Sequence, residues 1–347
     1  RRPRGAVAAD RLRADRFALD GRERVMHAEG MQESTFRFEG RDGLGIHTFR
    51  WLPGSEGEGE VEIKACLQIA HGMSEHALRY RGLAEALTGA GYAVYANDHR
   101  GHGRSVSKGQ PLGHMGERDT WNAAVADVYA LGLRILEEAP GKPLILLGHS
   151  MGSFLLQQLL FERPDHAIAA ILSGSNGKPP PIAQVGRGIA RAERLRLGKA
   201  GKSPLLQKMS FGEFNKSFEP ARTEYDWLSR DPDVVDAYIA DPLCGVPIST
   251  QSWVDLLDAL APLGQLENQR RIPAHTPLFL FSGERDPVGD FGRGVRRLRD
   301  AYRAAGLDDL TLRLYPEGRH EMLNEINREE VFADLLEFCD RVVREHS

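Results

Sequence analysis

The chain has 347 residues with 41% hydrophobic and 27% charged side chains, proportions typical of a globular protein. Its formal net charge of −4 gives no net basic character, so the composition argues against a nucleic-acid partner. The sequence lacks the ~20 consecutive apolar residues that a membrane-spanning helix needs. Its three cysteines lie far apart with no CxxC pair, which predicts free thiols, a reducing cytoplasmic location and no zinc site.

Residues 1–30 are rich in arginine, but they also contain acidic residues and lack the apolar core of a secretory signal. We expect a disordered leader here. Because position 1 is not methionine, Met26 or Met31 is the expected biological start.

Residues 34–54 contain two β-rich runs around a turn at 41–43, the pattern of a hairpin. Beyond it, short apolar runs alternate with helical stretches. The further strands are expected at Cys66–Ala70, Ala93–Ala96, Leu144–Leu147, Ala169–Leu172, Leu278–Ser282 and Thr311–Tyr315. The helices are expected at Tyr80–Gly89, Asp119–Glu138, Gly152–Arg163, Gly294–Ala305 and Arg328–Glu345. Apolar strands separated by helices predict an α/β fold, with a mostly parallel eight-stranded sheet covered on both faces.

The alternation of strands and helices stops after Ser173. Residues 175–262 are too long for a structureless loop inside a compact domain, and their content is helical and aromatic. We therefore expect a helical cap at 175–262, inserted after the sixth strand between core segments 31–174 and 263–347. Helices in this cap are expected at Ile182–Leu206, Asp233–Ala240 and Thr250–Leu260.

The strand expected at 144–147 runs into Gly148-His149-Ser150-Met151-Gly152 and then into an amphipathic helix. A GxSxG motif between a buried strand and a helix indicates a nucleophile elbow, which exposes the serine hydroxyl at the head of the helix. Gly148 and Gly152 are required because larger side chains would strike the neighbouring strand and helix. Ser150 is therefore the candidate nucleophile.

A serine nucleophile needs a base that a third group holds in place, and the chain order in this arrangement is serine, acid, histidine. Asp286 follows the strand expected at 278–282, and His320 follows the next strand. Both loops belong to the carboxyl edge of the sheet, where open α/β sheets place their sites. We predict His320 as general base and Asp286 as its partner, with Glu284 or Asp290 as substitutes for the acid.

An oxyanion hole needs two backbone N–H donors, one directly after the nucleophile and one from the loop after an earlier strand. Met151 is the expected first donor. Met73 is the expected second donor, because Gly72 before it permits close approach of the backbone. We expect His71 to brace this loop rather than to act as a base or a ligand.

With these motifs the chain resembles the monoacylglycerol lipase and lysophospholipase branch of the α/β-hydrolases, also called serine aminopeptidase-like hydrolases. The matching segments are HGMSEHALRY (71–80), NDHRGHGRS (97–105), GHSMG (148–152), the loop 283–286 and GRHEMLNE (318–325). The resemblance implies attack of Ser150 on an acyl ester, an acyl-enzyme intermediate and deacylation by water, with Asp286 and His320 completing the triad. It implies no cofactor.

The family also has a turn that Asp98, Arg100 and His102 match, and the resemblance implies that these residues brace the loop under the site. A metal site at His99 and His102 is disfavoured, because no further ligand has suitable spacing. Ser153 is a departure, since the family often has a second glycine there. The segment 214–231 is another, because it is similar to bacterial lysophospholipase-like members and so leaves the acyl and head-group preference open.

The cap should lie over Ser150 as a lid, and its aromatic and aliphatic residues are expected to line an acyl channel, as ligand pockets are mostly apolar. These residues are Phe211, Phe214, Phe218, Tyr225, Trp227, Leu228 and Trp253. They could equally form the small core of the cap itself. The basic stretch 185–208 predicts either contact with an anionic membrane surface or a solvated face.

We expect an esterase or lipase acting on monoacylglycerols, lysophospholipids or similar single-chain esters. The alternatives are an aminopeptidase that holds a substrate ammonium through Glu213, Glu219 or Glu224, an acyltransferase, and a binding protein on the same fold. Dehalogenase and epoxide hydrolase activities are excluded, because they need an aspartate where this chain has Ser150. The oligomeric state is not predicted.

Overall fold

The computed structural model describes residues 26–28, 30–54, 62–179 and 182–346. Residues 1–25 of the expected leader lie outside the described residues. Residues 26–28, expected in the same leader, instead form strand β1 (Met26–Ala28), which pairs antiparallel with β2 (Met31–Glu39). The predicted leader is therefore wrong at its carboxyl end, because pairing with β2 extends the sheet by one strand.

The central sheet has nine strands in the order β1-β2-β3-β5-β4-β6-β7-β8-β9. The strands after β2 are β3 (Gly45–Pro53), β4 (Ala65–Ala70), β5 (Tyr92–Asn97), β6 (Leu144–His149), β7 (Ala169–Ser173), β8 (Leu278–Gly283) and β9 (Leu310–Tyr315). The pairs from β1 to β5 are antiparallel, and the pairs from β5 through β4 and β6 to β9 are parallel. All eight predicted strands are present in a mostly parallel sheet, as predicted, and β1 is the unexpected ninth.

The strand order reverses at β4, because β5 lies on one side of it and β6 on the other. The loops that leave the carboxyl ends of β4 and β6 therefore meet at a switch point, which is where open α/β sheets form their binding crevices. The loop after β4 carries Met73, and the loop after β6 carries Ser150.

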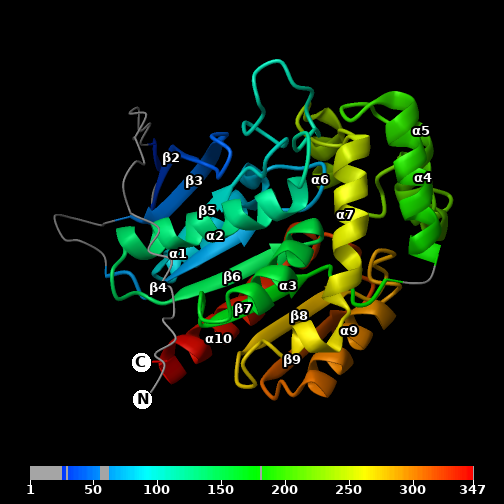
Figure 1. The fold of residues 1–347 in the computed structure, drawn as a ribbon. Helices are drawn as coiled ribbons and strands as arrows, with labels where there is room; N and C mark the ends of the chain where they lie inside the picture. Colours follow the sequence, from blue (N-terminus) through cyan, green and yellow to red (C-terminus); the bar gives the residue numbers. More distant parts are fainter. Residues whose placement is uncertain (1–25, 29, 55–61, 180–181, 347) are drawn as a thin grey trace, which may run out of the picture.

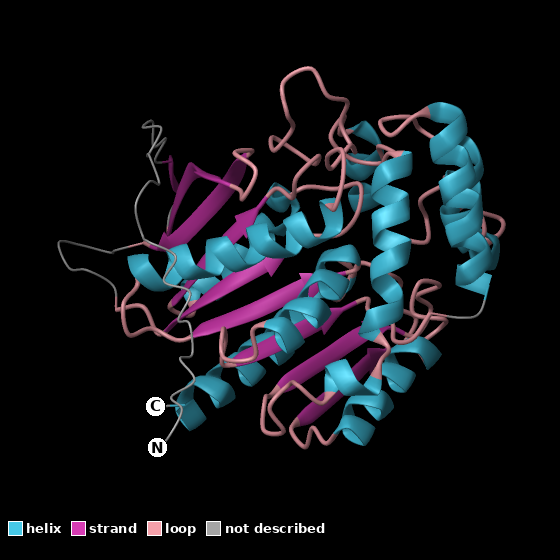
Figure 2. Ribbon diagram, viewed as in Figure 1, coloured by secondary structure: helices cyan, strands magenta, loops and turns pink. Residues whose placement is uncertain are grey.

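Helices cover both faces of the sheet (Figure 2). Helices α2 (Thr120–Glu138), α3 (Met151–Glu162) and α9 (Arg293–Ala305) pack on one face, and α1 (Arg81–Gly89) and α10 (Arg328–His346) pack on the other. Side chains of the central strands alternate between these faces. On β6, Leu144 and Leu146 belong to the first core cluster, whereas Ile145 and Leu147 belong to the second. Burial on both faces explains why these strands are apolar without interruption.

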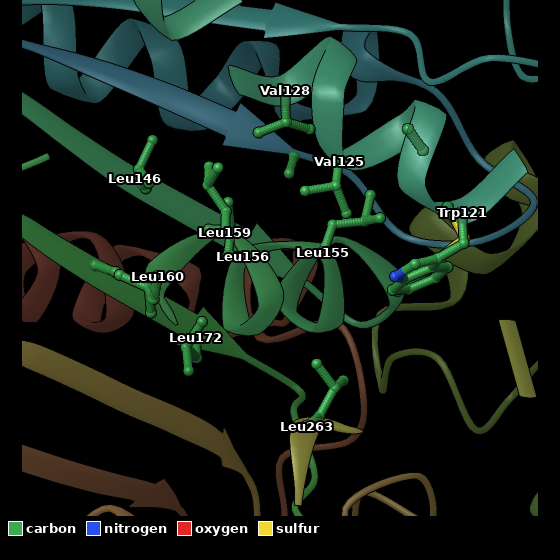
Figure 3. Packing of buried hydrophobic residues seen from close by; sticks show 14 of the residues in the cluster. Trp121, Val125, Val128, Leu146, Leu155, Leu156, Leu159, Leu160, Leu172 and Leu263 are labelled. Carbon is green, nitrogen blue, oxygen red and sulfur yellow. The ribbon is translucent and has the colours of Figure 1, made fainter. Parts of the chain in front are cut away.

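Helix α3 is anchored by leucines at nearly every turn, and Figure 3 shows Leu155, Leu156 and Leu159 among side chains of α2 and the sheet. All three leucines are buried. Because α3 begins directly after Ser150, this packing also fixes the position of the candidate nucleophile.

The segment between β7 and β8, called the insertion below, contains α4 (Ile182–Leu197), α5 (Pro204–Phe211), α6 (Pro232–Ala240), α7 (Thr250–Leu263) and α8 (Leu266–Gln269). In Figure 1, α4, α5 and α7 lie beyond the ends to which the parallel strand arrows point. The single helix predicted for residues 182–206 is wrong. Gly198 has a φ of +76° and ends α4, and Pro204 starts α5 behind the N-cap Ser203.

Among the described helices, none combines the length and the apolar character that crossing a membrane requires.

Candidate active site

Ser150 lies at the turn between β6 and α3. Its backbone φ of 50° and ψ of −117° are strained for a residue with a side chain. Its N–H donates to the carbonyl oxygen of Ser173, at the end of the neighbouring β7, over 2.9 Å. This sharp turn places Ser150 at the N-terminus of α3, where partial positive charge favours a developing anion.

The two glycines of the motif permit close packing around this turn. A Cβ atom added at Gly152 would lie 2.0 Å from the carbonyl oxygen of Ala70, and one added at Gly148 would lie 2.7 Å from the carbonyl oxygen of Gly152. Neither position accepts a larger residue at the present separation of β4, β6 and α3. Ser153 is fully buried and donates to the carbonyl oxygen of Ser150 over 2.6 Å, so the departure from the family glycine adds a hydrogen bond beneath the elbow.

Asp286 and His320 form a buried hydrogen-bonded pair. The Nδ1 atom of His320 lies 3.0 Å from Oδ1 of Asp286. Asp286 also accepts from the hydroxyl of Ser282 over 2.8 Å and from the N–H of Val288 over 2.9 Å. These bonds fix the carboxylate in the loop after β8 and orient the imidazole from the loop after β9.

The electrostatics of this pair favour its charged form. Burial opposes ionisation of Asp286, but the nearby imidazole of His320 and the three hydrogen bonds hold its pKa below the usual value. Burial also opposes a charged His320, but the carboxylate of Asp286 raises the pKa of the imidazole above 6.5. An ionised Asp286 accepts the Nδ1 proton of His320, which leaves Nε2 as the basic atom.

Glu284 and Asp290, the two alternatives to Asp286 as the acid, are not the partners of His320 in the structure. Glu284 is exposed, and Asp290 forms ion pairs with Arg293 at 2.6 Å and Arg297 at 3.0 Å. Asp286 is therefore the carboxylate that contacts His320.

Ser150 and His320 line the same cavity, which has a volume of about 170 Å³. The Ser150 hydroxyl makes no hydrogen bond to any described residue, His320 included. Catalytic hydrogen bonds are often long without substrate and shorten in the reacting complex. The structure thus joins the predicted acid, Asp286, to the predicted base, His320, and places the candidate nucleophile on the wall of the cavity that His320 also lines.

The loop after β4 borders Ser150. A Cβ atom added at Gly72 would lie 2.6 Å from Oε1 of Glu75 and 3.3 Å from the Cβ atom of Ser150, so a larger residue would crowd the contact between this loop and the elbow. Met73 and Met151 line the same cavity as Ser150. Met151 is the first residue of α3, and the N–H groups of a first helical turn have no partner within the helix.

His71 braces this loop through both ring nitrogens. Nδ1 lies 2.7 Å from the carbonyl oxygen of Gly72, and Nε2 accepts from the N–H of His99 over 2.8 Å. Burial lowers its pKa well below the usual value, so the ring is neutral. Asp98 supports the same region, because its carboxylate accepts from the N–H groups of Ala77 at 2.9 Å and Arg104 at 2.7 Å.

Arg100 and His102 belong to this support as well. Arg100 is buried and pairs with Asp127 at 2.8 Å and Asp42 at 2.9 Å. His102 lies with Nδ1 3.1 Å from the carbonyl oxygen of Arg100, and burial lowers its pKa to about 4.

Six of the seven cap residues predicted to line an acyl channel line the cavity, namely Phe211, Phe214, Tyr225, Trp227, Leu228 and Trp253. Phe218 does not, and its assignment is wrong. Its ring instead lies under the guanidinium of Arg319, 4.4 Å from the ring centre, within a small aromatic cluster of the insertion. Trp227 contacts the histidine loop directly, because its ring centre lies 5.2 Å from that of His320.

Several lining residues were not predicted. Phe154 of α3 and Leu256 and Leu260 of α7 contribute apolar walls, and Glu75 and Glu321 contribute carboxylates. The signal for the two glutamates was present, since each stands inside a matched motif segment and within two positions of a predicted site residue. Their burial was not evident from the sequence.

One group of residues with metal-ligand side chains occurs among the described residues, formed by His76, Asp241 and Cys244. His76 Nε2 already lies 2.9 Å from a carboxylate oxygen of Asp241. Burial raises the pKa of the Cys244 thiol, which keeps it protonated and a poor ligand. This chemistry does not favour a metal ion.

The chain matches the family described as "Serine aminopeptidase, S33" over residues 61–327. It is 32% identical to a monoacylglycerol lipase from Mycolicibacterium smegmatis over 307 residues, which cover 87% of this chain and 95% of that protein. A human monoglyceride lipase is 30% identical over 264 residues, covering 76% and 77% of the two chains. The crystal structure of a thermostable carboxyl esterase from Bacillus coagulans in complex with glycerol has a TM-score of 0.81 at 23% identity, covering 90% of this chain and 99% of that one, and supports the fold.

The family match spans the loops that carry all three predicted triad residues, and the monoacylglycerol lipase from Mycolicibacterium smegmatis aligns over nearly its whole length. The chain belongs to the serine aminopeptidase-type family of α/β-hydrolases and, within it, to the branch that resembles monoacylglycerol lipases.

Proposed function

We propose that the chain is a serine hydrolase that cleaves carboxylic esters of single acyl chains, with Ser150, His320 and Asp286 as its catalytic triad. One observation carries this proposal. His320, joined over 3.0 Å to the buried Asp286, lines the same cavity as the serine of a strained strand–turn–helix elbow. A nucleophile, an acid and a general base in this chain order are the parts that acyl transfer needs on such a fold.

The reaction would proceed in two halves. Nε2 of His320 takes the hydroxyl proton as Ser150 attacks the ester carbonyl carbon, and Asp286 stabilises the resulting imidazolium. The N–H groups of Met73 and Met151 would hold the oxyanion of the tetrahedral intermediate. His320 then donates its proton to the departing alcohol, leaving an acyl group on Ser150. A water molecule, deprotonated by the same histidine, then attacks the acyl carbon, and His320 returns the proton to the oxygen of Ser150 as the carboxylic acid leaves.

The cavity supports an ester with one acyl chain. Its lining is mostly aromatic and aliphatic, as an acyl pocket should be. The relatives named monoacylglycerol or monoglyceride lipases favour a glycerol ester over a lysophospholipid or a simple ester, and we adopt that order of preference.

The aminopeptidase alternative receives less support. Glu213, Glu219 and Glu224 are exposed and do not line the cavity that contains Ser150. The carboxylates that do line it, Glu75 and Glu321, already pair with Arg79 at 2.7 and 2.6 Å. A substrate ammonium would therefore have to displace an arginine to find a partner.

A substrate panel tests this proposal. Purified protein is assayed with monoacylglycerols, lysophosphatidylcholine, a p-nitrophenyl acyl series and an aminoacyl-naphthylamide, with Ser150→Ala as the inactive control. We expect ester turnover that Ser150→Ala abolishes, and fluorophosphonate labelling of the wild-type chain at Ser150. Turnover of the naphthylamide alone would favour the peptidase, and a folded protein without labelling would favour a binding protein.

We also propose a protein of a reducing compartment, with peripheral membrane contact through α4. All three cysteines are free and buried, which supports the first part. Several basic side chains of α4 have partners, since Arg187 and Arg191 both pair with Asp258. The membrane proposal therefore rests more on Leu195, which is 86% exposed, and Val185, which is 54% exposed. The fraction of protein that sediments with anionic vesicles should fall in the double variant Leu195→Ser, Val185→Ser. Equal sedimentation of the variant and the wild type would refute the membrane contact.

A further inference from the structure

One largely buried arginine, Arg79, connects the two loops that carry the predicted oxyanion donor and the predicted base. Nη1 of Arg79 donates to Glu75 over 2.7 Å and to Glu321 over 2.6 Å, and Nη2 donates to the second oxygen of Glu321 over 2.6 Å. The side chains of Arg79, Glu75 and Glu321 are 11%, 3% and 5% exposed. Glu321 follows His320 in the chain, and Glu75 lies in the loop after β4.

Glu75 holds the backbone on the amino-terminal side of Met73. Its Oε1 atom accepts from the N–H of Gly72 over 2.5 Å and from the hydroxyl of Tyr80 over 2.9 Å. Because Gly72 immediately precedes Met73, this carboxylate determines how the loop enters the position of the oxyanion donor.

The insertion holds the backbone on the carboxyl-terminal side of Met73. The carbonyl oxygen of Ser74 accepts from the hydroxyl of Tyr238 over 3.0 Å and from the N–H of Gly245 over 2.8 Å. Ser74 itself has a φ of 60°, an uncommon value outside glycine. The guanidinium of Arg79 lies 4.9 Å from the centre of the Tyr238 ring, so the arginine also contacts the residue that anchors this side.

Glu321 extends the connection to the base. Its N–H donates to the carbonyl oxygen of Leu228 over 2.8 Å, and the N–H of His320 donates to that of Trp227 over 3.3 Å. Two carboxylates and one guanidinium in a buried place are a poor source of net stability, because their desolvation offsets much of their attraction. A role in fixing geometry explains their presence better.

We propose that Arg79 is a positioning residue, which holds the Gly72–Met73 loop and the His320 loop in one arrangement so that oxyanion donor and base face the same acyl carbon. This inference rests on the proposed triad mechanism. Arg79 acts through Glu75 and Glu321 and does not itself touch the reacting atoms.

The test compares Arg79→Met and Arg79→Lys with the matched control Arg81→Met. Arg81 lies two residues away, is 40% exposed and pairs with Glu33 and Glu85, away from the cavity. Two readouts are used, the rate of Ser150 phosphonylation by a fluorophosphonate and the kcat and KM for p-nitrophenyl butyrate. We expect Arg79→Met to lower kcat and the phosphonylation rate by about 10²-fold while KM stays within about 3-fold. Arg79→Lys keeps the positive charge without the planar guanidinium, so its kcat and phosphonylation rate should lie between those of the wild type and Arg79→Met. Arg81→Met should resemble the wild type.

The pH profile separates positioning from general damage. His320 faces the carboxylates of Asp286, Glu75 and Glu321 and the ring of His149, which is neutral because burial lowers its pKa to about 4. Glu321→Gln removes a negative charge near His320, so the acidic limb of kcat/KM should move to lower pH. Arg79→Met removes a positive charge, so the limb should move to higher pH.

Opposite shifts in variants that remain folded would support the proposal. A folded Arg79→Met with the wild-type phosphonylation rate would overturn it, as would an equal loss in Arg81→Met or acidic limbs that move in the same direction. If the wild type is phosphonylated at Ser150 but turns over no ester, the proposed substrate is wrong, and the phosphonylation rates still decide the role of Arg79. If the wild type is not phosphonylated, both proposals fail.

Discussion

At the scale of single residues, the balance between burial and charge at His320 predicts a pH dependence. Burial favours the neutral ring, but the carboxylate of Asp286 outweighs it and raises the pKa of His320 above 6.5. A general base must be neutral to accept a proton, so kcat/KM should be low in acid and rise with pH through an apparent pKa above 6.5. A pH–rate profile on a p-nitrophenyl ester measures this limb, and a midpoint well below 6.5 would contradict the assignment of His320 as base.

Replacement of the buried carboxylate gives a second prediction. Asp286→Asn should lower kcat by roughly 10³–10⁴-fold, because the amide no longer stabilises the imidazolium or selects the Nδ1–H tautomer. Asp290→Asn is the matched control, since Asp290 pairs with two arginines on the surface of the same loop. Steady-state kinetics with equal activity in Asp286→Asn would show that another carboxylate supports the base.

The sequence predicted the contact between Asp286 and His320 and the place of Ser150 at the same cavity, because each residue stands in a local motif and the three appear in a fixed chain order. The Arg79–Glu321 pair could not be predicted, because 242 positions separate its members and each residue looks like an ordinary surface charge in the sequence. The contact depends on how the loops after β4 and β9 meet, which no local pattern describes.

At the scale of elements, the close approach of β4, β6 and α3 depends on the second elbow glycine. Gly152→Ala would place a Cβ atom 2.0 Å from the backbone oxygen of Ala70, so the helix must shift. We expect a loss of about 1–3 kcal/mol in the free energy of unfolding and a large loss of activity. Gly82→Ala is the control, because nothing lies within 4 Å of its added Cβ atom in α1, and it should be neutral or stabilising by about 0.5–1 kcal/mol. Chemical denaturation measures both, and equal stability of the two variants would contradict the packing argument.

Most helices and strands of the core could be predicted from the sequence, because apolar strands and amphipathic helices have different periods. The helices of the insertion were harder to predict. Its first helix is predicted to run through residue 206, but Gly198 and Pro204 divide this stretch into α4 and α5. Phe218 is predicted to face substrate, but it packs in the small cluster of the insertion instead. The sequence shows that a cap residue is aromatic, but it does not show which side of the cap the ring faces. The three-residue β1 was missed because it gains its order only from pairing with β2.

At the scale of the whole molecule, the strand order explains why sequence-distant loops form one site. The reversal at β4 brings together the loops after β4 and β6, and the parallel neighbours β7, β8 and β9 add the loops with Asp286 and His320 at the same edge. The insertion leaves the sheet after β7 and returns to it at β8 through α7 and α8, and its side chains complete the cavity over Ser150. We therefore expect substrate size to be set jointly by the core and the insertion.

This joint lining predicts a change in acyl preference when the α7 wall is enlarged. Leu260→Trp places a large ring in a cavity of about 170 Å³, so long acyl chains should lose space before short ones do. We expect kcat/KM for a p-nitrophenyl palmitate to fall by more than about 10-fold while that for the butyrate stays within about 3-fold, since one misfitting group in an apolar pocket is worth about 1–3 kcal/mol. Ile239→Trp is the control, because Ile239 is 48% exposed on α6 of the same insertion and does not line the cavity. An equal fall for both esters in Leu260→Trp would instead indicate that the ring disturbs Ser150 or His320, and an unchanged ratio would remove α7 from the acyl pocket.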